Sequence, residues 1–564
     1  MAVPTECTVL VIGGGPGGSY AAAALAREGI STVLLEADVF PRYHVGESMV
    51  ASLRHFLRFI DLDTTFENHG FVKKTGAAFK LNNQREAYTD FVVAAGPDSY
   101  AWNVIRSESD DLMFRHAGKS GAKIFDGTRV NAIEFAPLDV GEDHPNDSNN
   151  NAPSNPGLPV SATWSRKDGS SGEIKFGYLV DASGRTGLVS TKYLKNRTFN
   201  QELKNVASWG YWRGAIQYGV GTPKEGQPFF EALQDGSGWA WFIPLHNMTT
   251  SVGIVMNQAM STDKKKTTAS LSSKEFYLAS VQGARGVAGL LSKAELATDI
   301  KHASDWSYSA SSYGSPYIRI VGDAGAFIDP YFSSGVHLAL SGALSAAVTI
   351  CASIKGDCEE RVAWKWHSQG VAERFTRFLL VVLGATKQIR SKDAPVLNSS
   401  GDDGFDDAFS IIRPVIQGIA DVDGKTSTEE VNKAVDFTYN AVHQNTPEER
   451  KAVVQELQNS NDQAEGGNGT SSHTWKTVVN EALEDEERKV MTVVKNVFAD
   501  YFTVDAFDGM VANLKHGSLG LVKTSIEETE SGEKVADKRP RVELDAKQAI
   551  VEHRFVEVAM PTAV

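Results

Sequence analysis

The sequence predicts an α/β fold that opens with a β-α-β unit. Residues 8–12 (TVLVI) form a continuous apolar run of strand length, and residues 19–27 (SYAAAALAR) form an alanine-rich segment typical of a helix. A second apolar run, residues 32–35 (TVLL), is the next expected strand. Because glycines fill the turn between the first strand and the helix, the pattern is that of a Rossmann-like, dinucleotide-binding unit.

The glycine-rich turn reads GGGPGG and fits the pattern G-x-G-x-x-G. Gly13 permits the tight turn, Gly15 lets the backbone approach a pyrophosphate, and Gly18 lets helix and strand pack closely. Pro16 opens the helix, whose N-terminus faces the phosphates. Glu36 ends the second strand, where an acidic side chain accepts the ribose hydroxyls. These residues predict a dinucleotide site, and a purely structural glycine turn is the alternative.

Composition indicates a globular protein of more than one domain. The 564 residues are 41% hydrophobic and 22% charged, with a formal net charge of −14. An acidic chain without basic blocks is a poor candidate for binding nucleic acid or an anionic membrane. Three cysteines without a CxxC pair, together with the absence of a signal-peptide pattern, predict a reducing, cytoplasmic location. No histidine pair stands out at metal-ligand spacing, so no metal is expected.

The later chain suggests a core followed by a helical region. Residues 1–385 are expected to form the core, interleaved with a substrate-binding sheet at about 80–105 and 205–300, where aromatic and apolar residues alternate with turns. Residues 386–564 are expected to be mainly helical and to cover the substrate pocket. A polar insertion at 139–159 is expected to connect two strands.

Residues 336–354 contain no Lys, Arg, Asp or Glu and approach the length of a membrane span. Serine or threonine recurs every four residues from Ser341 to Ser353, which gives the expected helix one small polar stripe. We therefore expect a buried core helix, with a membrane span as the alternative.

Two distant segments favour FAD as the dinucleotide. Residues 178–185 (YLVDASGR) and 320–324 (IVGDA) resemble two motifs of the FAD-monooxygenase superfamily, which includes the aromatic hydroxylases. The resemblance implies that Asp323 contacts the ribityl and pyrophosphate region of FAD. Arg106, followed by Asp110 in a helix, resembles the arginine near the FAD in that superfamily. Either Asp323 or Arg106 could instead be an ordinary salt-bridge residue.

Three further elements indicate the reaction. Residues 239–244 (WAWFIP) read W-x-W-x-I-P, and residues 327–335 (FIDPYFSSG) read F-x-x-P-x-x-S-x-G. With Lys74 they resemble the signature of the flavin-dependent halogenases, over roughly residues 5–385. The greatest similarity is to fungal halogenases that chlorinate phenolic polyketides.

The resemblance implies a set of reactants. FADH2 reacts with O2 and chloride (or bromide) to give hypohalous acid, which Lys74 delivers to the aromatic ring as a chloramine or through a hydrogen bond. Because no second Rossmann fingerprint is found, a separate NAD(P)H-dependent flavin reductase is expected to supply FADH2. For an arbitrary lysine, a solvated position on the surface is the default expectation. The adjacent Lys73 therefore serves as the comparison residue for Lys74.

The resemblance also assigns the remaining site residues. Halide is expected at Ser334 and Gly335, at a helix N-terminus, although Ser334 could be a plain helix cap. Further flavin contacts are expected from Gly335 and from the segment RYHVGES, through Arg42, Gly46 and Ser48. A wall between flavin and substrate is expected from three residues of the W-x-W-x-I-P motif: Trp239, Trp241 and Pro244. Plain core packing is the alternative for each tryptophan.

Phe332 departs from the tryptophan halogenases, which usually carry a glutamate just before the serine of this motif. A small phenolic substrate is therefore expected, with chlorination ortho or para to its hydroxyl, in a monomer or homodimer. A flavin-dependent aromatic hydroxylase is the second hypothesis, and a non-enzymatic FAD-binding protein is the third.

Overall fold

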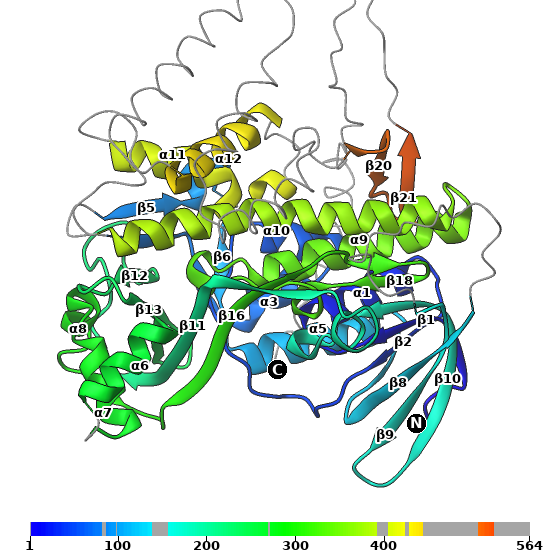
Figure 1. The fold of residues 1–564 in the computed structure, drawn as a ribbon, viewed down its shortest axis with the longest axis horizontal. Helices are drawn as coiled ribbons and strands as arrows, with labels where there is room; N and C mark the ends of the chain where they lie inside the picture. The colour runs from blue at the N-terminus through cyan, green and yellow to red at the C-terminus, as the bar shows by residue number, and fades with distance from the viewer. Residues whose placement is uncertain are drawn as a thin grey trace, which may run out of the picture.

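The computed structural model describes residues 2–81, 86–97, 99–137, 156–268, 271–391, 404–422, 428–443 and 506–523. These residues form two large eight-stranded sheets and two small sheets. Two long helices, α9 (Gly335–Lys355) and α10 (Glu360–Arg390), pack against each other, and α10 extends from one large sheet to the other (Figure 1).

The first sheet contains the predicted β-α-β unit. Five of its strands are parallel, in the order β18 (Ile318–Ile320), β10 (Ser171–Asp181), β1 (Glu6–Ile12), β2 (Thr32–Leu35) and β7 (Lys123–Phe125). The short β17 (Gly314–Ser315) pairs antiparallel at the β18 edge. Helix α1 (Pro16–Arg27) connects β1 to β2, so the Rossmann-like fold is confirmed.

Helices and a folded-over ribbon cover the two faces of this sheet. Helices α1, α5 (Arg106–Lys119) and α9 pack together on one face. Strands β8 (Thr128–Ala136) and β9 (Leu158–Arg166) continue antiparallel from β10 and pack on the other face. The pairing of β8 with β9 confirms that the polar insertion connects two strands, although most of residues 139–159 lies outside the described residues.

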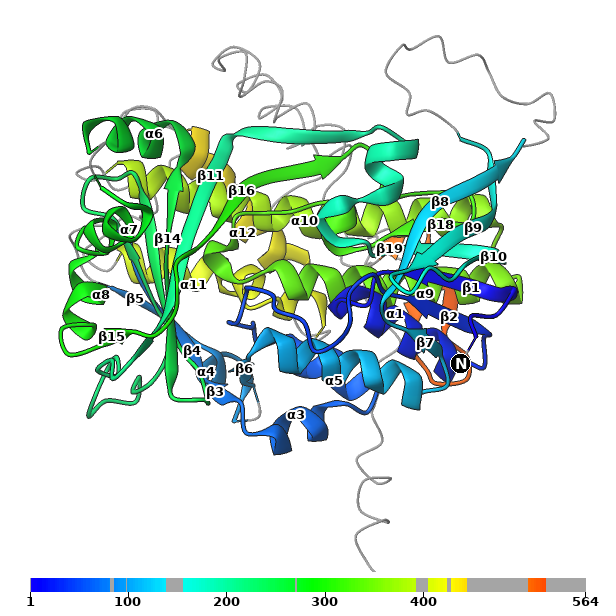
Figure 2. The same cartoon turned by 90° about the horizontal axis from the view of Figure 1, so that it is seen from below.

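The second sheet is largely antiparallel, and five of its strands overlap residues 205–300, where part of the substrate-binding sheet is expected. Its strands follow the order β15 (Glu295–Leu296), β11 (Arg197–Arg213), β14 (Thr249–Asn257), β13 (Gly238–Pro244), β12 (Phe229–Ala232), β4 (Gly76–Lys80) and β5 (Ala87–Asp90), and β16 (Lys301–Ala310) also pairs with β11. The pair β12–β4 is parallel. Helices α6 (Gln258–Thr267), α7 (Ser273–Val281) and α8 (Arg285–Leu290) lie on its outer side (Figure 2).

A short connecting region links the sheets. It comprises α2 (Leu53–Phe59), α3 (Asp63–His69), β3 (Val72–Lys74), α4 (Phe91–Ala95) and β6 (Ala101–Asn103). Strands β3 and β6 pair antiparallel, with Lys74 opposite Ala101. This pairing places Lys74 beside β6, whose residues Ala101 and Trp102 belong to the core that includes α1, α5 and α9.

Helix α9 is a core helix. Among the described residues it alone is long and apolar enough to cross a membrane, and 72% of its apolar window is buried inside the protein. Its small polar stripe is used internally: Ser345 Oγ lies 2.9 Å from Nδ1 of His367, and Thr349 accepts a hydrogen bond from Arg319. Ser341, at the start of the stripe, donates a hydrogen bond to the Leu338 carbonyl oxygen, so these three residues all have partners inside the protein.

The described parts of residues 386–564 contain both helices and strands, and most of this range lies outside the described residues. Helix α10 continues through residue 385 without a break, and α11 (Gly404–Ile416) and α12 (Thr428–His443) follow it. A small antiparallel sheet, β19 (Ala506–Phe507), β20 (Met510–Asn513) and β21 (Gly520–Lys523), packs on α9 and α10 and was not anticipated from the sequence. Trp366 of α10 anchors it by donating a hydrogen bond to the carbonyl oxygen of Met510, at 3.0 Å.

Candidate active site

The glycine turn has the shape of a phosphate-binding loop. Gly13 has a φ of +99°, and a Cβ there would lie 2.2 Å from the carbonyl oxygen of Ala182. A Cβ on Gly18 would lie 1.9 Å from the Gly13 carbonyl oxygen. At Gly15 the nearest atom to a Cβ would be a guanidinium nitrogen of Arg42, at 3.5 Å. Gly13 and Gly18 are thus required for folding of the turn, whereas Gly15 keeps one side of it open.

The N-terminus of α1 and the end of β2 complete this turn. Pro16 is the first residue of α1, and the N-cap residue is Gly15, so no N-cap side chain occupies the N-terminus of the helix. Glu36 is buried and accepts hydrogen bonds from the backbone N–H of Gly14 and, at 2.8 Å, of Asp38. Two backbone donors therefore fix this carboxylate beside the glycine turn, where it was predicted.

Arg42 and Arg106 converge on Asp110. Arg106 makes a bidentate pair with Asp110 at 2.9 and 3.1 Å, and Arg42 reaches the same carboxylate at 3.0 Å. Burial acts to raise the pKa of Asp110, but the charge of Arg106 and its hydrogen bonds outweigh burial and lower it. Arg106 is thus both a salt-bridge residue and a positioned cation, and Asp110 holds Arg42 beside the glycine turn.

The RYHVGES segment is held against α5. Arg106 donates hydrogen bonds to the carbonyl oxygens of Val45 and Gly46, at 2.9 and 3.3 Å. Gly46 has a φ of +103°, which disfavours any other residue there. The neighbouring Glu47 is buried, which raises its pKa, and it accepts a 2.7 Å hydrogen bond from the hydroxyl of Tyr211. Glu47 and Tyr211 are 164 residues apart in the chain, and no local sequence pattern indicated their contact.

Asp323 lies just beyond the end of β18. Burial raises its pKa, and the positive charges of Arg185, Arg106 and Arg197 act in the opposite direction. Glu36 follows β2 of the same parallel sheet, in which β10 and β1 lie between β18 and β2. The carboxyl ends of parallel strands form the usual ligand edge of such folds, so both acids are at the expected edge.

Lys74 is buried rather than solvated. Its side chain is 2% exposed, and Nζ donates hydrogen bonds to Ser48 Oγ at 2.8 Å and to the Met49 carbonyl oxygen at 2.7 Å. The amine lies 5.2 Å from the centroid of the Phe91 ring. Burial lowers the pKa of Lys74 to about 7. Ser48, which was predicted near the flavin, therefore contacts the lysine.

Lys73 provides the opposite case. Its side chain is 54% exposed and forms an ion pair with Glu67. The hydrogen bond from Lys73 to Glu67 raises the lysine pKa. Because neighbours in a strand point to opposite faces, one of two adjacent lysines enters the core and the other reaches solvent.

Ser334 and Gly335 form the start of α9. Ser334 makes no side-chain capping bond, so it is not a conventional serine cap. Its hydroxyl is buried and has no hydrogen-bond partner among the described residues. Nothing lies within 4 Å of a Cβ built on Gly335. An unpartnered hydroxyl beside free N–H groups at the start of a 21-residue helix can hold a small anion.

The two motif tryptophans share one face of β13. Their ring centroids lie 5.9 Å apart, and Trp241 donates a 3.0 Å hydrogen bond to Ser251. Trp239 contacts the ring of Tyr331 edge-on at 5.0 Å. Pro244 ends the strand. Both tryptophans are nearly fully buried, so they form a continuous aromatic layer as well as part of the core.

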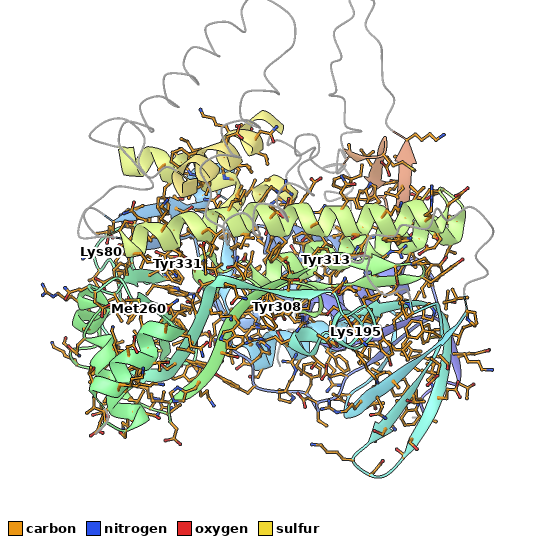
Figure 3. The ribbon with its side chains drawn as sticks, viewed as in Figure 1. Lys80, Lys195, Met260, Tyr308, Tyr313 and Tyr331 are labelled. Atoms are coloured by element: carbon orange, nitrogen blue, oxygen red, sulfur yellow. The ribbon has the colours of Figure 1, made fainter. Side chains whose placement is uncertain are left out.

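Beyond this layer lies a cluster of aromatic rings. Phe332 packs against Phe79 at 5.3 Å and Phe409 at 6.5 Å. Tyr331 lies in the half of the molecule that contains β12 and β13 (Figure 3), and its buried hydroxyl has no partner among the described residues. Phe409 comes from α11, 330 residues after Phe79, and no local sequence pattern indicated its contribution.

The known proteins that this chain resembles in sequence include halogenases. The profile of the family described as tryptophan halogenase matches residues 8–125 and 163–389. The flavin-dependent halogenase otaD of Aspergillus carbonarius is 63% identical over 523 residues, covering 92% of this chain and 99% of the relative. The sulochrin halogenase gedL of Aspergillus terreus is 54% identical over 521 residues, covering 92% and 94%.

A solved structure shares the fold. The myxobacterial chondrochloren halogenase CndH, described as a variant of FAD-dependent halogenases, aligns with a TM-score of 0.59 and 24% identity, over 78% of this chain and 97% of that one. The family match and the 63% identity to a curated flavin-dependent halogenase show that the chain belongs to the flavin-dependent halogenases of the tryptophan halogenase family.

Proposed function

We propose that this halogenase uses FADH2, O2 and chloride to chlorinate an electron-rich phenolic substrate, with Lys74 as the catalytic residue. The buried amine of Lys74 carries the proposal. It has neutral hydrogen-bond partners, Ser48 and a backbone carbonyl, and a pKa of about 7. A buried ammonium that served only structure would be expected to have a carboxylate partner.

The residues at the ligand edge of the first sheet fit FAD. Gly15 leaves room for a pyrophosphate, Glu36 is fixed beside the turn, and Arg42 and Arg106 supply positive charge. Asp323 would hold the ribityl region. When bound in reduced form, the flavin would supply hypochlorous acid from O2 and chloride.

Lys74 can then act in either of two protonation states. With a pKa of about 7, roughly half of the amine is neutral at neutral pH. The neutral nitrogen can attack the chlorine of hypochlorous acid, so that an N–Cl bond forms, the O–Cl bond breaks and water leaves. The charged amine can instead donate a hydrogen bond to hypochlorous acid. In both cases the ring carbon receives chlorine and loses a proton.

Chloride is proposed to bind at Ser334 and Gly335. The buried hydroxyl of Ser334 has no other partner among the described residues, and Gly335 is open. The positive end of the α9 dipole favours an anion there. Bromide has the same charge and would use the same donors.

A phenolic substrate is favoured over free tryptophan. Phe332 stands where tryptophan halogenases usually have a glutamate, and it lies among the rings of Phe79, Tyr331 and Phe409. Aromatic rings stack favourably on such a surface. The relative gedL is a sulochrin halogenase, which supports a fungal secondary metabolite as substrate. The layer formed by Trp239 and Trp241 would keep the substrate from direct oxygen transfer by the flavin.

The proposal includes a separate flavin reductase, a cytoplasmic location and a monomer or homodimer. A direct test supplies the protein with FAD, NADH, a flavin reductase and a resorcylic-type phenol, with either chloride or bromide. Mass spectrometry should show one added chlorine or bromine with its isotope pattern, and no product without the reductase. A product that gains oxygen in the absence of halogen would instead indicate the hydroxylase reaction.

A further inference from the structure

Two histidines and a glutamate from three separate elements meet at one point of the surface. His69 is the last residue of α3, Glu108 lies in the first turn of α5, and His246 follows β13. Figure 2 shows α3 alongside α5. The Nε2 atom of His69 lies 2.7 Å from Glu108 Oε2, and that of His246 lies 3.2 Å from the same oxygen. Sequence spacing could not reveal this cluster.

The donor set is that of a transition-metal site. Imidazole nitrogens and a carboxylate oxygen are the usual zinc ligands besides cysteine, at bond lengths that place neighbouring ligand atoms about 3.3 Å apart in a tetrahedron. The three ligand atoms all lie within 4.8 Å of one another. Small side-chain rotations would therefore bring them to coordination distance. A hydrogen bond already holds His69 to Glu108, and His246 lies at ion-pair distance from the same carboxylate.

The surroundings favour a site that keeps one position open. The side chains of His69, Glu108 and His246 are 29%, 36% and 22% exposed, so that an ion has an entry path and water can supply a fourth ligand. The ring of Phe71 packs against both histidines, with ring-centroid distances of 4.3 Å to His69 and 5.3 Å to His246. This ring limits the rotation of both imidazoles.

We propose that His69, Glu108 and His246 bind one divalent transition-metal ion, with zinc as the best match to the ligands. The ion would connect α3 and α5 to the segment that follows β13. Helix α5 carries Arg106 of the proposed flavin site, and β13 carries the tryptophan layer. The metal would thus fix these two parts of the halogenase relative to each other, outside the reacting groups.

The test uses the purified full-length chain after treatment with EDTA. Isothermal titration with zinc chloride should give a saturable isotherm with one ion per chain, and zinc should raise the unfolding temperature. His246→Ala and Glu108→Gln should each weaken zinc binding by at least about tenfold. His302→Ala, which changes an exposed histidine outside the cluster, should bind zinc like the wild type.

Glu108→Gln separates metal binding from a structural role. Its amide oxygen can still accept a hydrogen bond from a histidine, so the metal-free variant should unfold close to the wild-type temperature while losing the rise caused by zinc. Absence of saturable zinc binding, or equal binding by wild type, His246→Ala and Glu108→Gln, would overturn the proposal. Because the readout is binding rather than chlorination, it is independent of the proposed function.

Discussion

Replacing Lys74 with methionine should change how the stability of the protein depends on pH. The amine has an ordinary pKa of 10.5 in the unfolded chain and about 7 in the folded protein, because burial disfavours the ammonium. Between these values the unfolded state binds more protons than the folded state. The free energy of unfolding of the wild type should therefore rise with pH through this window and level off above it.

The size of the effect follows from the two pKa values. One pKa unit corresponds to about 1.36 kcal/mol, so the contribution of Lys74 to the free energy of unfolding should increase by about 2 kcal/mol between pH 7 and pH 9. Methionine has a similar length and no titrating group. The difference in unfolding free energy between wild type and Lys74→Met should therefore change by this amount over the window, in favour of the wild type as pH rises.

Denaturant unfolding at pH 7, 8 and 9 would measure this difference. Lys73→Met is the matched control, because Lys73 is exposed and its hydrogen bond to Glu67 raises its pKa. Curves for wild type and Lys74→Met that stay parallel across the three pH values would refute the argument, since they would show that Lys74 is not a desolvated amine.

Three further predictions concern the proposed binding sites. Gly18→Ala should unfold more easily and lose FAD, because its Cβ would lie 1.9 Å from a backbone carbonyl oxygen, whereas Gly15→Ala should fold normally and bind FAD weakly; flavin fluorescence and circular dichroism separate the two. Asp110→Ala should destabilise the protein by about 3–5 kcal/mol, since it leaves the buried Arg106 without its carboxylate, and denaturant unfolding would measure the loss. Ser334→Ala should leave stability nearly unchanged but raise the KM for chloride about fivefold, the equivalent of about 1 kcal/mol for one hydrogen bond; an unchanged chloride dependence would place the halide elsewhere.

Much of the first sheet could be predicted from the sequence because its signals are local. The apolar run of β1, the glycine turn and the helix α1 lie within 22 residues, and each has a steric reason that acts over a few residues. The burial of α9 was also predictable, since its serine and threonine stripe needs partners inside the protein.

Contacts between distant segments could not be predicted in the same way. Phe409 meets Phe79, and Tyr211 meets Glu47, through the packing of helices and strands far apart in the chain. The contact between Ser48 and Lys74 likewise depends on how β3 enters the core. The strands β19–β21 are two to four residues long, too short for a periodic pattern to reveal them.

The central claim is that Lys74 delivers chlorine to a phenolic ring. The most direct measurement compares wild type, Lys74→Ala and Lys73→Ala in a reaction with FAD, a flavin reductase, NADH, chloride and a resorcylic-type phenol, and follows both the product mass and the oxidation of reduced flavin. Wild type and Lys73→Ala should give a product with one added chlorine, whereas Lys74→Ala should give none although it still binds and oxidises reduced flavin. Undiminished chlorination by Lys74→Ala would contradict the claim.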